Sequence, residues 1–220
     1  LPPAGWTGPG QLHFGFATDI THYAQPFRAL GAASQKGFDF MLLIGDIMYA
    51  DNPPVVANTM AGYADRYWLT WDDPHFAALG LSTPLFMMWD DHELYDDYYP
   101  GMLAPGETTD RYPAARAAFD LYAGSHNPDT SGVLYYSFSA PGADFFVLDT
   151  RSYRSPPGSI DNSQKTMLGA VQREALLNYL EQSDAAFKFI VSSVPVAPGE
   201  ASSDTWSGYQ TELALILAEI

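Results

Sequence analysis

Residues 38–51 read FDFMLLIGDIMYAD, a mostly apolar run that ends in glycine, tyrosine and two aspartates. A short apolar segment of this length, bounded by polar residues, is typical of a buried strand. We therefore expect a strand over Phe38–Ile44, with Asp46, Tyr49 and Asp51 just beyond its carboxyl end. In an open α/β sheet, residues at this end of a strand face the ligand crevice.

Two more segments repeat the pattern of a short apolar run followed by acidic residues. Leu12–Thr18 is followed by Asp19, and Pro84–Trp89 runs into Asp-Asp-His-Glu at residues 90–93. Both runs predict buried strands. Further strands are predicted at Lys188–Ser193 and in a hairpin through Pro141-Gly142, with arms Val133–Ser139 and Asp144–Leu148.

The segments between the strands have the spacing of amphipathic helices. They are Pro26–Gln35, Val56–Trp71, Thr109–Tyr122, Gln164–Gln182 and Tyr209–Ile220. This alternation predicts a layered α/β fold with a largely parallel or mixed sheet. Because the last helical pattern reaches Ile220 without a stop signal, we expect a single domain over residues 1–220 that is incomplete at its C-terminal side.

The composition excludes several classes of function. Ten basic residues stand against 26 acidic ones, a formal charge of -16, which argues against duplex nucleic acid as a partner. The absence of cysteine excludes disulfides, thiolate metal sites and a cysteine nucleophile, so chemistry must use oxygen and imidazole groups. No apolar run approaches the roughly 18 to 20 residues of a membrane span, and Leu1–Gly10 lacks the features of a signal peptide.

The three acidic strand ends should converge on one crevice, because ligands gather at the carboxyl ends of strands in open α/β sheets. Asp19, Asp46 and the Asp91-His92 pair would then meet there. Carboxylates favour magnesium, calcium or manganese, and a phenolate such as Tyr49 favours ferric iron. Two such ions, about 3.5 to 4 Å apart, could clamp a phosphoryl group and hold a hydroxide for in-line attack. The pattern therefore predicts a hydrolase.

Each of these residues also has a purely structural interpretation. Asp46 could only cap a turn, and Asp19 could cap the segment that follows it. Residues 90–93 could form an exposed acidic helix start that the helix dipole stabilises. The occurrence of all three motifs at consecutive strand ends favours the functional interpretation over these alternatives.

Four motifs follow one another along the chain. They are Gly45-Asp46-Ile47-Met48-Tyr49 extended by Ala50-Asp51, Trp89-Asp90-Asp91-His92-Glu93 followed by Asp96-Asp97, Leu148-Asp149-Thr150-Arg151, and Leu168-Gly169 with Gln172. Together they resemble the PhoD-like branch of the calcineurin-like metallophosphoesterase superfamily, which is related to the purple acid phosphatases. The resemblance implies a layered α/β/β/α sandwich and hydrolysis of phosphate monoesters or diesters, as in PhoD-like alkaline phosphatases and phosphodiesterases.

The resemblance also implies a role for each matching residue. Asp46 would bridge two metal ions, Tyr49 would be a phenolate ligand of a ferric ion, and Asp91 would bind the second metal. His92 would contact the phosphate or protonate the leaving group. The implied cofactor is a binuclear centre of iron together with calcium, zinc or manganese.

Two further residues complete the predicted site. The first loop carries Asp19 where PhoD proteins commonly have a cysteine ligand, and in this it is more similar to purple acid phosphatases. Arg151 would contact the phosphate or act as a structural anchor, because its planar guanidinium can hold two oxygens at once. An ion pair with Asp149 or another buried carboxylate is the competing interpretation.

The closing histidines of the superfamily, in a Gly-Asp-x-His type motif, have no counterpart in this sequence. We therefore expect a second chain carrying the C-terminal half as a partner, beside the phosphate ester substrate. The resemblance also implies a secreted or periplasmic location. The alternative to an enzyme is a non-catalytic acidic binding module stabilised by metal, or a degenerate relative of the hydrolases.

Overall fold

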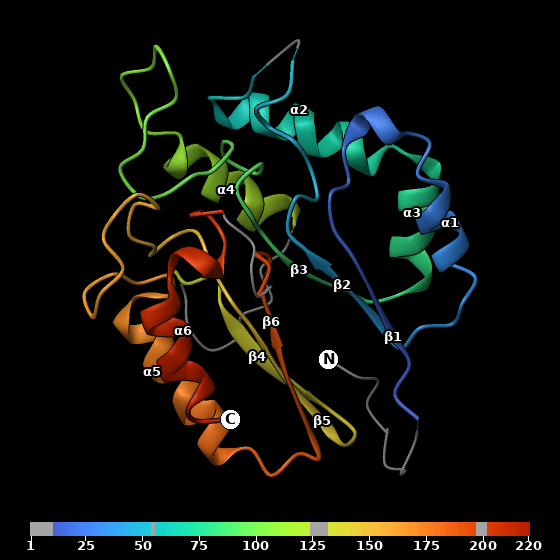
Figure 1. Ribbon diagram of the computed structural model, residues 1–220. Coiled ribbons are helices and arrows are strands. Elements are labelled where there is room, and N and C mark those ends of the chain that lie inside the picture. Colours follow the sequence, from blue (N-terminus) through green and yellow to red (C-terminus); the bar gives the residue numbers. More distant parts are fainter. Residues whose placement is uncertain (1–10, 54–55, 124–131, 197–201) are drawn as a thin grey trace. The chain divides into compact units, whose positions relative to one another are not determined.

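The computed structural model describes residues 11–53, 56–123, 132–196 and 202–220 (Figure 1). Of the described residues, those within 11–98 and 103–123 form the N-terminal unit, and those within 99–102 and 132–220 form the C-terminal unit. The described residues contain six strands and six α-helices, which confirms the predicted mixed α/β class. The stacking of the sheets into an α/β/β/α sandwich and the extent of a single domain remain predictions.

The N-terminal unit contains a parallel sheet in the order β1-β2-β3. Its strands are β1 (Phe14–Ala17), β2 (Phe40–Ile44) and β3 (Leu85–Met88). The central strand β2 is buried along most of its length, which is why it is a continuous apolar run in the sequence. Because the three strands are parallel, their carboxyl ends lie at the same edge of the sheet.

Four α-helices accompany this sheet, and they pack in pairs. They are α1 (Arg28–Ala33), α2 (Met60–Trp71), α3 (Pro74–Ser82) and α4 (Tyr112–Tyr122), with a short 3-10 helix, η1, at His22–Ala24. Helix α1 packs against α3, and α2 packs against α4. The amphipathic patterns of the sequence predict α1, α2 and α4 with longer bounds, whereas α3 was not predicted.

The C-terminal unit contains a mixed sheet in the order β4-β5-β6. The antiparallel hairpin of β4 (Tyr136–Ala140) and β5 (Ala143–Val147) turns through Pro141-Gly142 as predicted, and β6 (Phe187–Val191) runs parallel to β5. The helices are α5 (Gly169–Gln182), α6 (Gln210–Leu217) and the 3-10 helix η2 (Trp206–Gly208).

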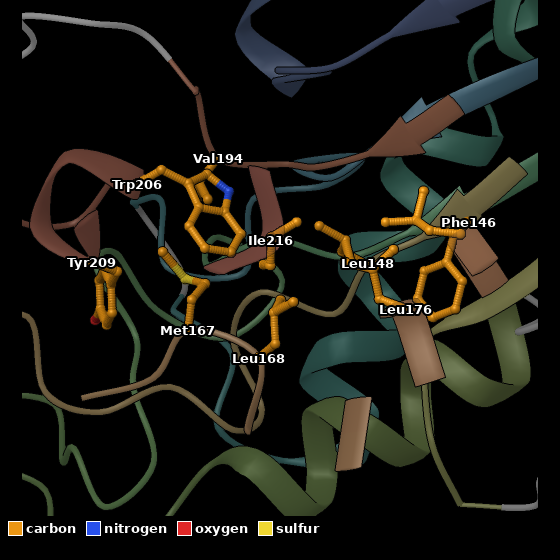
Figure 2. Packing of buried hydrophobic residues seen from close by; sticks show 10 residues of the cluster. Phe146, Leu148, Met167, Leu168, Leu176, Val194, Trp206, Tyr209 and Ile216 are labelled. Atoms are coloured by element: carbon orange, nitrogen blue, oxygen red, sulfur yellow. The ribbon is translucent and has the colours of Figure 1, made fainter. Parts of the chain in front are cut away.

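The core of the C-terminal unit joins residues from its sheet, its loops and its helices (Figure 2). Phe146 of β5 and Leu176 of α5 lie in one cluster with Trp206, Tyr209 and Ile216. The indole of Trp206 also donates a hydrogen bond to the Ser192 hydroxyl, 3.1 Å away. This packing fixes the loop that precedes α6. None of the helices in the described ranges has the length and apolar character that crossing a bilayer requires.

Candidate metal centre

The loops that follow β1, β2 and β3 meet at the carboxyl edge of the parallel sheet. The Ile20 amide donates to the Asp46 carbonyl at 2.8 Å, which ties the first loop to the second. The Ala50 amide donates to the His92 carbonyl, also at 2.8 Å, which ties the second loop to the third. The convergence of the three strand ends that the sequence predicts is therefore present.

The five residues that the sequence singles out in this unit lie together. Donor atoms of Asp46, Asp91 and His92 all lie within 4.8 Å of one another. The Tyr49 hydroxyl is 3.0 Å from Oδ1 of Asp19 and 3.2 Å from Oδ2 of Asp46, and donates to this carboxylate pair. The cluster thus combines carboxylate, phenol and imidazole groups, a donor set that suits hard and borderline cations.

Two of these aspartates have an unusual backbone conformation. Asp19 has a φ of 55° and Asp46 a φ of 52°, both in the left-handed region that residues other than glycine seldom adopt. Aspartate tolerates this region better than most residues because its short side chain can hydrogen-bond locally. Such conformations concentrate at functional sites, where the surrounding contacts hold them.

The electrostatics of Asp46 indicate that the cluster suits a cation. Burial, followed by the charges of Glu93, Asp90 and Asp91, raises the pKa of Asp46 to about 9. Within the described part of the chain, its Oδ1 is buried and has no hydrogen-bond partner. A bound cation would supply that partner and offset the crowded negative charge. The residues therefore fit the metal that the sequence predicts.

The same surroundings act on the Tyr49 phenol. Burial raises its pKa well above the ordinary value, and the charges of Asp46 and Asp19 raise it further. The phenol is therefore protonated beside these carboxylates and donates its hydrogen to them. A multiply charged cation would reverse this preference, because it favours the phenolate.

His92 is held by the carboxylate of Asp51, which is not among the predicted site residues. Nδ1 of His92 lies 2.9 Å from both oxygens of Asp51, and the imidazole stacks on the Tyr49 ring with centroids 4.2 Å apart. Burial opposes the imidazolium, but the Asp51 hydrogen bond and the charges of Asp46, Asp51 and Asp91 raise the pKa of His92 to about 9. The Asp51 contact leaves Nε2 as the nitrogen available for proton transfer.

The acidic pair Asp96-Asp97 acts through its backbone. The Asp96 amide donates to Oδ2 of Asp51 at 2.9 Å, and the Asp97 amide donates to Oδ2 of Asp91 at 2.6 Å. The turn after His92 therefore orients both carboxylates. The sequence does not predict this role, because every residue other than proline has a backbone amide hydrogen.

Arg151 lies in the C-terminal unit. Its guanidinium forms two hydrogen bonds of 2.9 Å with the two oxygens of Asp204, and its side chain is almost completely buried. Gln172 accepts from the Asp149 amide at 2.8 Å and donates to the Asp149 carbonyl at 2.9 Å, so the last two predicted motifs bind each other. These contacts correspond to the structural interpretation of Arg151, an ion pair with a carboxylate.

The raised pKa values predict how the metal-free protein responds to pH. The pKa values of Asp46 and His92 are both raised to about 9. The folded Asp46 carboxyl binds a proton that the unfolded chain has released, so stability falls as pH rises from about 4 towards 9. The raised pKa of His92 acts in the same direction: its stabilisation is complete below 6.5 and is lost as pH rises through about 9.

We expect the Tm of chelator-treated protein to be lower at pH 8.5 than at pH 5.5, by about 4 °C or more. Added metal should diminish the difference, because a cation stabilises the charged carboxylates. Thermal unfolding followed by circular dichroism measures both effects. An equal or higher Tm at the alkaline pH would contradict the prediction.

Comparison with known proteins identifies the family. The model of the PhoD-like phosphatase family matches residues 16–220, so the chain belongs to this family and the resemblance seen in its motifs is confirmed. Alkaline phosphatase D of Bacillus subtilis (strain 168) is 25% identical over 255 residues, which include 96% of this chain and 43% of that protein. A solved structure described as that of PhoD shares the fold, with a TM-score of 0.82 at 22% identity over 94% of this chain and 48% of that one. The chain thus spans just under half the length of these relatives.

Proposed function

We propose that the protein hydrolyses phosphate monoesters or diesters at a metal centre in its N-terminal unit. The observation that carries the proposal is the donor set of Asp46, Asp91 and His92, two buried aspartates and a half-buried imidazole, whose ligand atoms lie within 4.8 Å of one another. Membership of the PhoD-like phosphatase family supports the same function and disfavours a non-catalytic binding module.

Two metal ions would be held by Asp19, Asp46, Tyr49 and Asp91, with Asp46 shared between them. The family resemblance favours iron together with calcium, zinc or manganese. When bound, the ions supply Lewis acidity that neutralises the phosphoryl oxygens and lowers the pKa of the attacking water. The resemblance also implies ligands in a Gly-Asp-x-His motif, so we propose that a further segment or a second chain completes the centre, and that the enzyme is exported.

His92 would act as the general acid. Asp51 holds Nδ1 and keeps the ring charged, so Nε2 can donate a proton to the ester oxygen as its bond to phosphorus breaks. Stacking on Tyr49 fixes the plane of the ring. The released alcohol would leave neutral, which avoids the expulsion of an alkoxide.

The direct test is hydrolysis of a nitrophenyl phosphate monoester and of the corresponding diester, with metal content measured by elemental analysis. Both are measured on the 220-residue chain and on the longest natural protein that contains it. Bound metal together with turnover of either ester supports the proposal, and the ratio of the two rates gives the preferred substrate. A visible absorption band lost in Tyr49→Phe would assign iron to the phenolate. A protein without metal that cleaves neither ester would overturn the proposal.

Replacing Asp51 should reduce turnover without removing the metal. In Asp51→Asn the side chain keeps its shape but loses the charge that stabilises the His92 imidazolium, so kcat should fall by about 10- to 100-fold. Metal content should stay that of the unmodified protein, and the alkaline limb of the pH profile should move to lower pH. The steady-state kinetics and the elemental analysis above measure these effects.

Asp96→Asn is the matched control for Asp51→Asn. The Asp96 carboxylate is 67% exposed and lies 3.9 Å from Nε2 of His92, and the contact of this residue with Asp51 uses only its backbone amide. We expect kcat within about twofold of the unmodified protein, as for most exposed charge pairs. An equal fall in kcat for both variants would contradict the role of Asp51.

A further inference from the structure

Glu93 is a buried carboxylate whose contacts are all directed at the backbone of the two metal-binding loops. Only 1% of the residue is exposed. Its Oε1 accepts from the Ile47 amide at 2.6 Å, and its Oε2 accepts from the Asp90 amide at 2.8 Å and the Asp46 amide at 3.2 Å. Both oxygens are thus occupied by amide donors, which indicates that Glu93 is not itself a metal ligand.

These hydrogen bonds fix the conformation of Asp46. The amides of Asp46 and Ile47 belong to the two peptide planes that flank the Asp46 α-carbon, so holding both amides holds its φ and ψ. Asp46 has the left-handed φ of 52°, a conformation that has a steric cost for an L-residue. The Glu93 carboxylate offsets that cost and keeps the Asp46 side chain aimed at the cluster.

The third hydrogen bond extends the effect to the other loop. The Asp90 amide donates to Glu93, and Asp90 directly precedes Asp91 in the chain. Asp91 has a donor atom within 4.8 Å of the donor atoms of Asp46 and His92. One carboxylate therefore ties the backbone beside Asp46 to the backbone beside Asp91. Their separation sets whether both can reach one metal centre.

We infer that Glu93 is a positioning residue of the metal centre, whose carboxylate holds Asp46 in its left-handed conformation at metal-binding distance from Asp91. The inference rests on the proposed metal centre. It predicts that disturbing Glu93 lowers metal affinity even in protein that remains folded, because the ligands are present but no longer held in place.

The sharpest variant is Glu93→Gln, which keeps the size of the side chain. One carboxylate oxygen becomes an amide NH₂ group, which can donate a hydrogen bond but cannot accept one. Because both oxygens of Glu93 face amide donors, neither orientation of the glutamine satisfies all three contacts. We expect the apparent Kd for Mn²⁺ to rise at least about 10-fold, as for other residues that orient metal ligands.

Glu212→Gln is the matched control. Glu212 is also 1% exposed, and it accepts from the backbone amides of Met167 and Leu168 in the C-terminal unit. It also forms an ion pair with Arg173, so its loss should cost at least as much stability as the loss of Glu93. If Glu93 acts on the metal centre, Glu212→Gln should lower the Tm but leave the Kd for Mn²⁺ within about twofold.

The experiment measures the free Mn²⁺ signal by electron paramagnetic resonance during titration of the full chain, with the Tm of each metal-free variant alongside. An unchanged Kd in folded Glu93→Gln, or an equal rise in Glu212→Gln, would overturn the inference. If Glu93→Gln does not fold, Glu93→Asp, which keeps both acceptor oxygens but shortens the reach, replaces it with the same expected loss of affinity. If neither folds at an Mn²⁺ concentration that saturates the unmodified protein, Glu93 serves the whole fold and the inference fails. Absence of Mn²⁺ binding by the unmodified protein would instead contradict the proposed function.

Discussion

Replacing Asp46 with asparagine should remove the metal from the protein and lower kcat/KM by about 1000-fold or more. The magnitude follows because Lewis-acid stabilisation of the transition state contributes several kcal/mol, and each 1.4 kcal/mol is a factor of ten in rate. In the proposed centre, Asp46 is the ligand that both metal ions would share. Its buried Oδ1 has no hydrogen-bond partner within the described residues, so a bound cation would be its partner.

Asparagine is chosen because it separates the loss of metal from the loss of folding. Asparagine tolerates the left-handed φ of this position, and it removes a carboxylate whose charged form is disfavoured by burial. The metal-free variant should therefore be at least as stable as the metal-free unmodified protein at pH 8. Elemental analysis, kinetics with the preferred nitrophenyl ester and thermal unfolding measure the three quantities.

Asp65→Asn makes the same chemical change at an exposed position of α2 and should leave all three quantities unchanged. Retention of metal and of activity within tenfold in Asp46→Asn would show that Asp46 does not bridge the ions. The proposed ligand set would then have to be revised, with Asp91 and His92 in place of Asp46 as its main members.

The strands of the parallel sheet were predictable from the sequence because each is a short apolar run with a polar boundary, whereas β4 alternates apolar and polar residues. Helix α3 was not predictable, because its nine residues include alanines, leucines and phenylalanine without a clear polar face. Its start does have a local signal. Asp73 accepts from the amides of His75 and Phe76 as the N-cap, and Pro74 occupies the first helical position, where its missing amide hydrogen has no cost.

The start of α5 shows why helix ends are harder to predict than helices. The sequence predicts a helix from Gln164, but α5 begins at Gly169. The amides of Met167 and Leu168 donate to Glu212, which lies more than 40 residues away in the chain. A local pattern cannot reveal a distant carboxylate that takes the hydrogen bonds of a helical turn.

The same distinction divides the residues of the candidate site. Asp19, Asp46, Tyr49, Asp91 and His92 were predictable because they occupy strand ends in a parallel sheet. Asp51 and Glu93 stand within quoted motifs, but their roles depend on contacts between loops 41 to 47 residues apart. Only the folded chain brings these carboxylates against the backbone of Asp46 and the ring of His92.

Removing the Asp204 carboxylate should destabilise the C-terminal unit by about 3 to 5 kcal/mol, the usual effect of breaking a buried ion pair from one side. Asp204 binds Arg151 with two hydrogen bonds of 2.9 Å, and Nη1 of Arg154 lies 2.5 Å from its Oδ1. Both arginines are about 2% exposed, so Asp204→Ala would leave two buried guanidinium groups without the counter-ion that they share. Urea unfolding of the metal-free chain measures the loss.

Asp120→Ala is the control, because Asp120 pairs with Arg116 at 3.0 Å on α4 and is 46% exposed. A partly exposed i,i+4 pair on a helix contributes about 0.3 to 0.5 kcal/mol, so the two variants should differ severalfold in their effect. A loss below about 1 kcal/mol in Asp204→Ala would contradict the buried ion-pair network.

Replacing Arg151 with alanine decides between the two roles proposed for this residue. Since both of its terminal nitrogens already bind Asp204, Arg151→Ala should lower stability by a similar amount and leave KM unchanged, whereas a raised KM at unchanged stability would assign Arg151 to phosphate binding.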